Sequence, residues 1–160
     1  MAAGTRIEQA RDVVALVPDP EIPVLTIDDL GILRGVDEQD GRIVVTITPT
    51  YSGCPAMDHI REQVGDVLAD AGFADAEVRM VYSPAWTTDW MSEEGKRKLR
   101  EFGISPPGRA GEPTPLTLPV ACPQCGSRRT SVISQFGSTA CKALYRCDAC
   151  QEPFDYFKAI

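Results

Sequence analysis

Residues 122–150 read CPQCGSRRTSVISQFGSTACKALYRCDAC and contain two Cys-x-x-Cys pairs, Cys122–Cys125 and Cys147–Cys150, with 21 residues between them. Two residues between paired cysteines let both thiolates face one metal ion across a tight turn, and two such turns complete a tetrahedral four-sulfur site. The segment between the pairs is long enough for a β-hairpin, which would bring the turns together. The sequence therefore predicts a structural Zn²⁺ site within an all-β zinc-ribbon module over residues 119–160. Iron suits the same four thiolates, so the identity of the metal stays open at this point.

The other uses of cysteine explain the pattern less well. A secreted disulfide framework would need an export signal, and the N-terminal sequence MAAGTRIEQARDVV contains no apolar core of that kind. A redox Cys-x-x-Cys would be followed by a helix, whereas glycine and a predicted strand follow Cys125. A segment of about 40 residues also needs a staple in order to fold. Cys141, a fifth cysteine in this region, is either a small buried hydrophobe or an extra thiolate near the metal.

Composition and charge restrict the classes of protein to which the chain can belong. The chain has 160 residues, of which 43% are hydrophobic, enough for one ordinary domain or for a small domain with a stapled module. Its net charge is −7, made up of −9 in residues 1–118 and +2 in residues 119–160. A nucleic-acid-binding role is therefore disfavoured for the whole chain and is conceivable for the tail alone. Since no apolar run could span a membrane, we expect a cytoplasmic protein without membrane contact.

Residues 1–103 predict a small mixed α/β domain. A T-x-x-E capping box at Thr5–Glu8 begins the first helix, and Asp40–Gly41 is a strong hairpin turn. The predicted elements, in order, are a helix from Thr5 to Val17, strands 30–36 and 42–48, a helix 55–71, a strand 76–82, a helix 93–102, and strands 129–136, 142–146 and 154–157.

A linker is predicted between the two regions, because residues 103–119 (GISPPGRAGEPTPLTLP) contain five prolines and three glycines. The expected fold class is α+β, with a mixed domain over residues 1–103 (helix, hairpin, helix, strand, helix), a linker over 104–118 and the all-β module over 119–160.

Cys54 is the one cysteine outside the tail, in the stretch TPTYSGCP just before the helix that is predicted to begin at Pro55. The positive end of a helix dipole stabilises a thiolate, so we expect a lowered pKa and raised reactivity, although a buried structural cysteine is the alternative. The chain's single histidine, His59, would lie more than one turn further along the helix. Because no nucleophile–base pair and no cofactor loop is visible, the sequence does not predict an enzyme.

Three stretches together resemble a known family. DPEIPVLTIDDLGIL (19–33), TPTYSGCP (48–55) and VYSPAWTTDWMSEEGKRKL (81–99) resemble the small α/β domain of SufT-like iron–sulfur cluster assembly factors. With the proline-rich stretch and the tail SQFGSTACKALYRCDACQEPFDYFK (134–158), residues 8–160 resemble the D-subunit family (PaaD) of bacterial phenylacetyl-CoA 1,2-epoxidase systems.

The resemblance implies an accessory protein in phenylacetate degradation rather than the oxygenase, whose di-iron chemistry belongs to other subunits. It implies a role in maturing that complex by handling iron–sulfur clusters or iron, with the other epoxidase subunits as partners. Asp19, Glu21 and Cys54 match the family's acidic loop and cysteine, and the four tail cysteines match its metal-binding turns. One thiol cannot hold a cluster, so a homodimer or a second protein would have to supply further ligands.

Two other functions stay open from the sequence. The chain could be a non-catalytic structural subunit that docks through its zinc module, in which case Cys54 would have no chemical role. It could also be a nucleic-acid-binding zinc ribbon, which the negative net charge disfavours.

Overall fold

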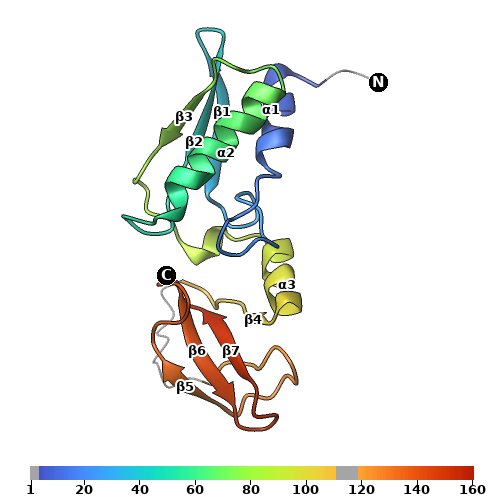
Figure 1. Ribbon diagram of the computed structural model, residues 1–160, viewed down its shortest axis with the longest axis vertical. Helices are drawn as coiled ribbons and strands as arrows, with labels where there is room; N and C mark the ends of the chain where they lie inside the picture. The colour runs from blue at the N-terminus through green and yellow to red at the C-terminus, as the bar shows by residue number, and fades with distance from the viewer. Residues whose placement is uncertain (1–3, 111–118) are drawn as a thin grey trace. The chain divides into compact units, whose positions relative to one another are not determined.

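A three-stranded sheet and two helices make up the first unit of the chain, which ends at Trp86. The computed structural model describes residues 4–110 and 119–160. The sheet has the order β1 (Leu33–Gln39), β2 (Arg42–Ile47), β3 (Glu77–Met80), with β2 antiparallel to β1 and parallel to β3. Helices α1 (Arg6–Val14) and α2 (Ala56–Asp70) pack against each other and against the sheet (Figure 1).

Local sequence signals account for the first helix and the hairpin. The Glu8 N–H donates to Thr5 Oγ1 at 3.2 Å, and Glu8 Oε2 accepts from the Thr5 N–H at 2.7 Å, so the predicted capping box is present. Asp40 and Gly41 have φ values of +52° and +76°, the left-handed conformation that a two-residue hairpin turn requires. The hairpin expected from Asp40–Gly41 is therefore confirmed.

The loop between α1 and β1 is longer than the sequence predicts. Helix α1 ends at Val14, because Pro18 has no N–H to donate to the Val14 carbonyl. The chain then forms a loop in which the Ile27 N–H donates to the Val17 carbonyl at 2.9 Å. Strand β1 begins at Leu33 rather than Leu30, since Gly31 adopts φ +75° within a turn.

The core of the first unit lies between the helices and the sheet. Alternate side chains of β2 point to one face of the sheet, and the apolar stripe of α2 is buried with them. The fully buried members are Ile43, Val45 and Ile47 of β2, Ile60, Val64 and Leu68 of α2, and Ala10 and Val14 of α1.

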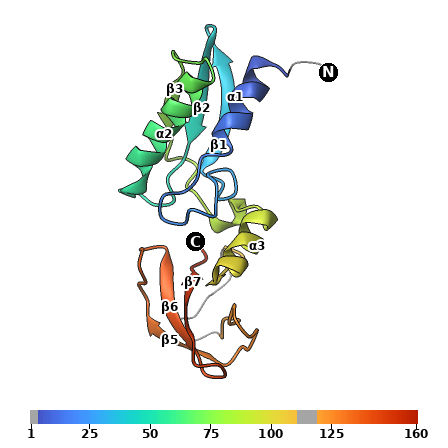
Figure 2. The ribbon, with the colours of Figure 1, turned by 45° about the vertical axis from the view of Figure 1, so that its right-hand side comes forward.

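Strand register brings three loops to one end of this sheet. Leu33, the first residue of β1, pairs with Ile47, the last residue of β2, and Ile47 also pairs with Met80, the last residue of β3. The loop before β1, the loop after β2 and the segment after β3 consequently meet at that end (Figures 1 and 2).

A four-stranded sheet organises the second unit, residues 87–160. Its order is β4 (Ile104–Ser105), β7 (Pro153–Phe157), β6 (Lys142–Cys147), β5 (Thr130–Ser134), antiparallel except for the β4–β7 pair. A short 3₁₀ helix, η1 (Thr88–Trp90), and helix α3 (Glu93–Phe102) precede the sheet. Ser92 caps α3 and Gly103 ends it with φ +90°, so the helix has the predicted range of 93–102.

Domain boundaries differ between sequence and structure. The contacts divide the chain between Trp86 and Thr87, whereas the composition places the first boundary at residue 103. Ile104 and Ser105 fall in the predicted linker but form β4, because they pair with Asp155 and Tyr156 of β7. The rest of the predicted linker reaches into residues 111–118, outside the described residues. Independent folding of segments 1–103 and 119–160 stays a prediction.

No helix within the described ranges is both long enough and apolar enough to span a membrane.

Two glycines should respond oppositely to alanine substitution. A Cβ at Gly137 would lie 2.9 Å from Asp155 Oδ1 and 3.4 Å from the Lys142 carbonyl, whereas one at Gly65, within α2, would meet open space. Gly137→Ala should lower the free energy of unfolding by at most about 1 kcal/mol, because the end of the Asp155 side chain has to shift, and Gly65→Ala should raise it by about 1 kcal/mol. Urea unfolding followed by circular dichroism measures both. Equal effects of the two substitutions would contradict this packing.

Candidate metal centre and thiol cavity

Two turns of equivalent geometry carry the four tail cysteines. In each turn the first cysteine's N–H donates to the carbonyl five residues later, and its carbonyl accepts from the N–H four residues later. In the first turn the Cys122 N–H donates to the Ser127 carbonyl and the Gly126 N–H donates to the Cys122 carbonyl, both at 2.9 Å. In the second turn the Cys147 N–H donates to the Glu152 carbonyl at 2.9 Å and the Gln151 N–H donates to the Cys147 carbonyl at 3.0 Å. The fourth residue after each first cysteine, Gly126 or Gln151, is left-handed, with φ +74° or +67°. The backbone thus folds around both pairs in the same way.

The four sulfur atoms gather at one point, all within 4.8 Å of one another. Cys122 Sγ lies 3.8 Å from Cys150 Sγ, and Cys125 Sγ lies 3.6 Å from Cys147 Sγ. Tetrahedral Zn²⁺ with Zn–S bonds of about 2.3 Å requires sulfur–sulfur separations of about 3.8 Å. All four are free thiols. The predicted convergence of Cys122, Cys125, Cys147 and Cys150 is therefore present, and the donor set fits a closed four-thiolate metal site.

The pKa values of the four thiols also favour the binding of a cation. The Cys150 N–H, 3.5 Å from Cys147 Sγ, lowers the pKa of Cys147 to about 7. The Glu152 N–H acts in the same direction on Cys150, but desolvation and the neighbouring sulfur atoms outweigh it and raise the pKa of Cys150 to about 12. Four thiols at these separations cannot all ionise unless a positive charge balances them. A divalent metal ion supplies that charge.

Cys141 does not join this group. Its side chain is buried, and its Sγ lies 3.0 Å from Thr139 Oγ1. Within the described parts of the chain, the metal-binding group consists of the other four tail cysteines.

Cys54 lies at the end of the first unit's sheet where the three loops meet. It directly precedes Pro55, the N-cap of α2, and its carbonyl accepts from the Met57 N–H at 3.2 Å. Gly53 has φ +81°, which lets the chain turn sharply before the cysteine. The half-buried thiol lies in the wall of a cavity of about 350 Å³. The other lining residues are Pro49, Gly53, Pro55, Met57, Asp58, Arg61, Met80 and Tyr82.

Sequence reasoning missed the sulfur-rich lining of this cavity. Met80 ends β3 and Tyr82 follows two residues later, and the Tyr82 hydroxyl donates to Met80 Sδ at 3.1 Å. The only available signal was their i, i+2 spacing, which places them on one side of an extended chain. His59, by contrast, is exposed on α2 and does not line this cavity.

Asp19 and Glu21 lie in the loop before β1, which reaches the same end of the sheet. Asp19 is 6% exposed, and its Oδ1 accepts from the N–H groups of Glu21 and Ile22 at 2.9 and 2.7 Å. The carboxylate therefore holds its own loop in shape. Neither acidic residue is among those that line the cavity of Cys54, and their participation in metal handling stays a prediction.

Comparisons with known proteins assign both regions. Residues 7–80 match the family model "Iron-sulfur cluster assembly protein", and residues 108–158 match "PaaD zinc beta ribbon domain". A relative from Escherichia coli, named as the D subunit of a "Putative 1,2-phenylacetyl-CoA epoxidase", is 50% identical over 160 residues, which cover 99% of this chain and 96% of that one.

Shorter relatives match the first region. The Staphylococcus aureus "Fe-S protein maturation auxiliary factor SufT" is 41% identical over 86 residues, which cover 52% of this chain and 97% of the relative. A crystal structure of a "Domain of Unknown Function DUF59 from Bacillus anthracis" is 29% identical with a TM-score of 0.53, and covers 58% of this chain and 90% of that one. The mixed α/β fold expected for the first region and the zinc ribbon expected for the second are thereby confirmed.

Removing one ligand of the four-cysteine group should release the metal and unfold the ribbon. We expect Cys125→Ser to abolish metal retention and to melt residues 119–160, because a structural four-ligand site contributes on the order of 10 kcal/mol to folding. The sheet of the first unit should survive. Metal content per chain and amide NMR spectra measure both effects. Cys141→Ala is the control and should keep the metal. A ribbon that stays folded in the Cys125 variant would contradict the assignment.

Proposed function

The chain belongs to the PaaD family, together with the Escherichia coli epoxidase relative, and from this membership we propose that it is an accessory subunit that helps to mature a phenylacetyl-CoA epoxidase system. Its cargo would be an iron–sulfur cluster or iron, delivered to the other subunits of that system. We further propose a cytoplasmic location and a non-catalytic role.

Relatives of two kinds support this proposal. One full-length relative is named as an epoxidase subunit, and the relatives of the first region are named as auxiliary factors of iron–sulfur protein maturation. A zinc ribbon joined to a region of the iron–sulfur maturation type would direct metal or cluster delivery toward one target, the epoxidase complex.

The observation that carries the proposal is the position of Cys54. Its thiol lines a cavity at the end of a sheet, beside the Met57 and Met80 side chains. Thiolate and thioether sulfur atoms are soft donors that suit iron–sulfur clusters and soft metal ions. The cavity thus offers sulfur ligands that suit such a cargo. Because it contains a single thiol, the cargo would bind weakly and could be released to a partner.

Further ligands must then come from outside this thiol. A cluster held through protein thiolates commonly uses four of them. A second copy of the chain or another protein of the epoxidase system would supply the rest, and Asp19 and Glu21 would act from the adjoining loop. Transient binding follows from this incomplete ligand set.

The four tail cysteines would have the separate role of holding structural Zn²⁺. Their closed geometry leaves no open position for exchange, as is usual in structural zinc sites. We therefore assign cargo to the first unit and structural metal to the second.

A docking subunit without metal delivery is the second candidate function. The ribbon exposes two large apolar side chains, Ile133 at 55% and Phe136 at 66%, which suits contact with another protein. In that case Cys54 would be a packing residue.

Substitution of Cys54 separates the two functions. We expect Cys54→Ser to leave the fold and the ribbon metal intact, while cells that carry it contain an epoxidase complex that is assembled but inactive or poor in iron. Iron content and activity of the purified complex measure this. Cys141→Ala, which removes a thiol outside the cavity, is the matched control. Normal iron content and activity with Cys54→Ser would overturn metal delivery and favour the docking role.

A further inference from the structure

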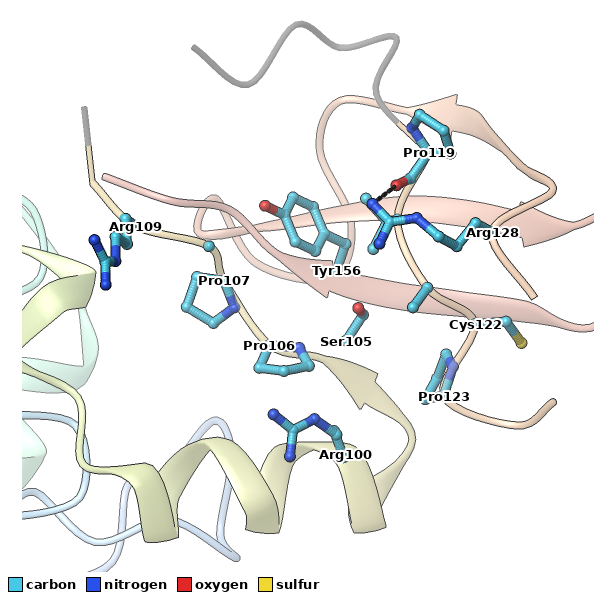
Figure 3. A pocket seen from close by; sticks show the side chains of 13 residues that line it. Arg100, Ser105, Pro106, Pro107, Arg109, Pro119, Cys122, Pro123, Arg128 and Tyr156 are labelled. Atoms are coloured by element: carbon cyan, nitrogen blue, oxygen red, sulfur yellow. Dashed lines mark hydrogen bonds between the residues drawn. The ribbon is translucent and has the colours of Figure 1, made fainter. Parts of the chain in front are cut away.

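The second unit contains a groove of about 380 Å³ beside the first cysteine turn. Its described lining comes from the end of α3, the segment after β4, the segment around the first cysteine pair, and β7 (Figure 3). The residues that line it include Arg100, Arg109, Arg128, Pro107, Val120 and Tyr156.

The walls of the groove are apolar and stiff. Pro106, Pro107, Pro119 and Pro123 line it together with Val120. A proline ring fixes its own backbone φ angle and carries no N–H, so these walls keep their shape and offer few backbone donors. An apolar side chain of a ligand could pack against them without displacing hydrogen bonds.

Three arginines supply the charge of the groove, each from a different segment (Figure 3). Arg100 lies in the last turn of α3, where the helix dipole favours a cation. Arg109 follows β4, and Arg128 follows the first cysteine pair. The Arg128 guanidinium donates to the Pro119 carbonyl at 3.3 Å, which uses one of its five N–H groups.

None of these three arginines has a carboxylate partner among the described residues. Other arginines of the chain do form such pairs, for example Arg6 with Glu38 and Arg146 with Asp148. Described carboxylates therefore do not neutralise the positive charge of the groove, and an anionic ligand could pair with it.

The groove also stands out against the charge of the whole chain. Residues 1–86 carry six Lys/Arg and 15 Asp/Glu, a net charge of −9, whereas residues 87–160 carry ten and eight, a net charge of +2. In an acidic protein, a groove lined by three arginines without carboxylate partners is a local feature of the second unit. An acidic partner would be repelled by the first unit and attracted here, which gives the contact its orientation.

We propose that this groove binds an acidic segment of a partner protein, with carboxylates on the three arginines and an apolar side chain against Val120 and the prolines. The proposal goes beyond the function proposed above, because it concerns the partner contact of the second unit and not the cargo at Cys54.

Carboxylates fit this groove better than phosphate. Phosphate sites are commonly built from backbone N–H groups at glycine-rich turns or helix N-termini. Here prolines form much of the wall, and the helix that borders the groove presents its C-terminal end. Guanidinium groups pair with carboxylates and with phosphate alike through two parallel hydrogen bonds, so the scarcity of backbone N–H groups is what favours carboxylates here.

Fluorescence anisotropy on the full metal-loaded chain tests the proposal. The probe is a short fluorescein-labelled peptide of alternating glutamate and leucine, and the matched probe has glutamine in place of glutamate. Arg109→Glu and Arg128→Glu should each weaken binding of the acidic peptide by about tenfold or more, since each replaces a charge-assisted contact by repulsion. Arg129→Glu, which changes the same charge one residue outside the groove, should change binding by less than about twofold.

Several outcomes would overturn the proposal. Equal weakening by Arg129→Glu would mean that the peptide responds to net charge alone. Equal binding of the glutamine peptide would exclude carboxylate recognition. Displacement by inorganic diphosphate at concentrations below those of the unlabelled peptide would indicate a site for small anions. Since Cys54 is unchanged in every variant, cluster handling can fail or succeed independently of these results.

Discussion

Convergence of four sulfur atoms on one point is the constraint on which the second unit depends. Cys122 and Cys147 belong to the four-cysteine group whose geometry fits a metal ion, and they are also members of the small buried cluster with Tyr145, Phe154 and Tyr156. A core of this size cannot offset the entropy of ordering its segment without a staple. We therefore expect the ribbon, its exposed apolar side chains and the arginine groove beside Cys122 to depend on a metal held by the four cysteines.

The first unit carries the half-buried Cys54 thiol at the end of a sheet with a well-packed core. The buried β2 strand and α2 form a rigid support, and three loops meet where the strands end. Asp19 holds one of these loops through backbone N–H groups, and Trp86 Nε1 donates to the Leu30 carbonyl at 2.8 Å within the same region. Cys54 is thus carried by a short turn on a well-packed scaffold, which is how binding residues are commonly positioned.

Features that depend only on residues close together in the sequence, such as helix caps and tight turns, were predicted correctly. The Thr5–Glu8 capping box, the Asp40–Gly41 turn and the helix over residues 93–102 are all present as expected, as is the four-cysteine group. The pairing of Ile104–Ser105 with β7 could not be predicted. It joins residues about 50 positions apart, and Ile104–Ser105 lies in a proline-rich stretch without the periodic pattern of a strand. The methionine lining near Cys54 was hidden for a similar reason, since β3 reaches the cavity only through its pairing with β2.

The central claim is that two metal chemistries are kept apart on one chain, with structural metal in the ribbon and transient cargo at Cys54. Elemental analysis combined with visible absorption on anaerobically purified protein, with and without the partner subunits, tests this most directly. We predict that zinc is retained in every sample, and that iron and cluster absorption accompany the partner complex only when Cys54 is intact. Iron or cluster absorption that follows Cys122, Cys125, Cys147 and Cys150 instead, and is indifferent to Cys54, would contradict the account.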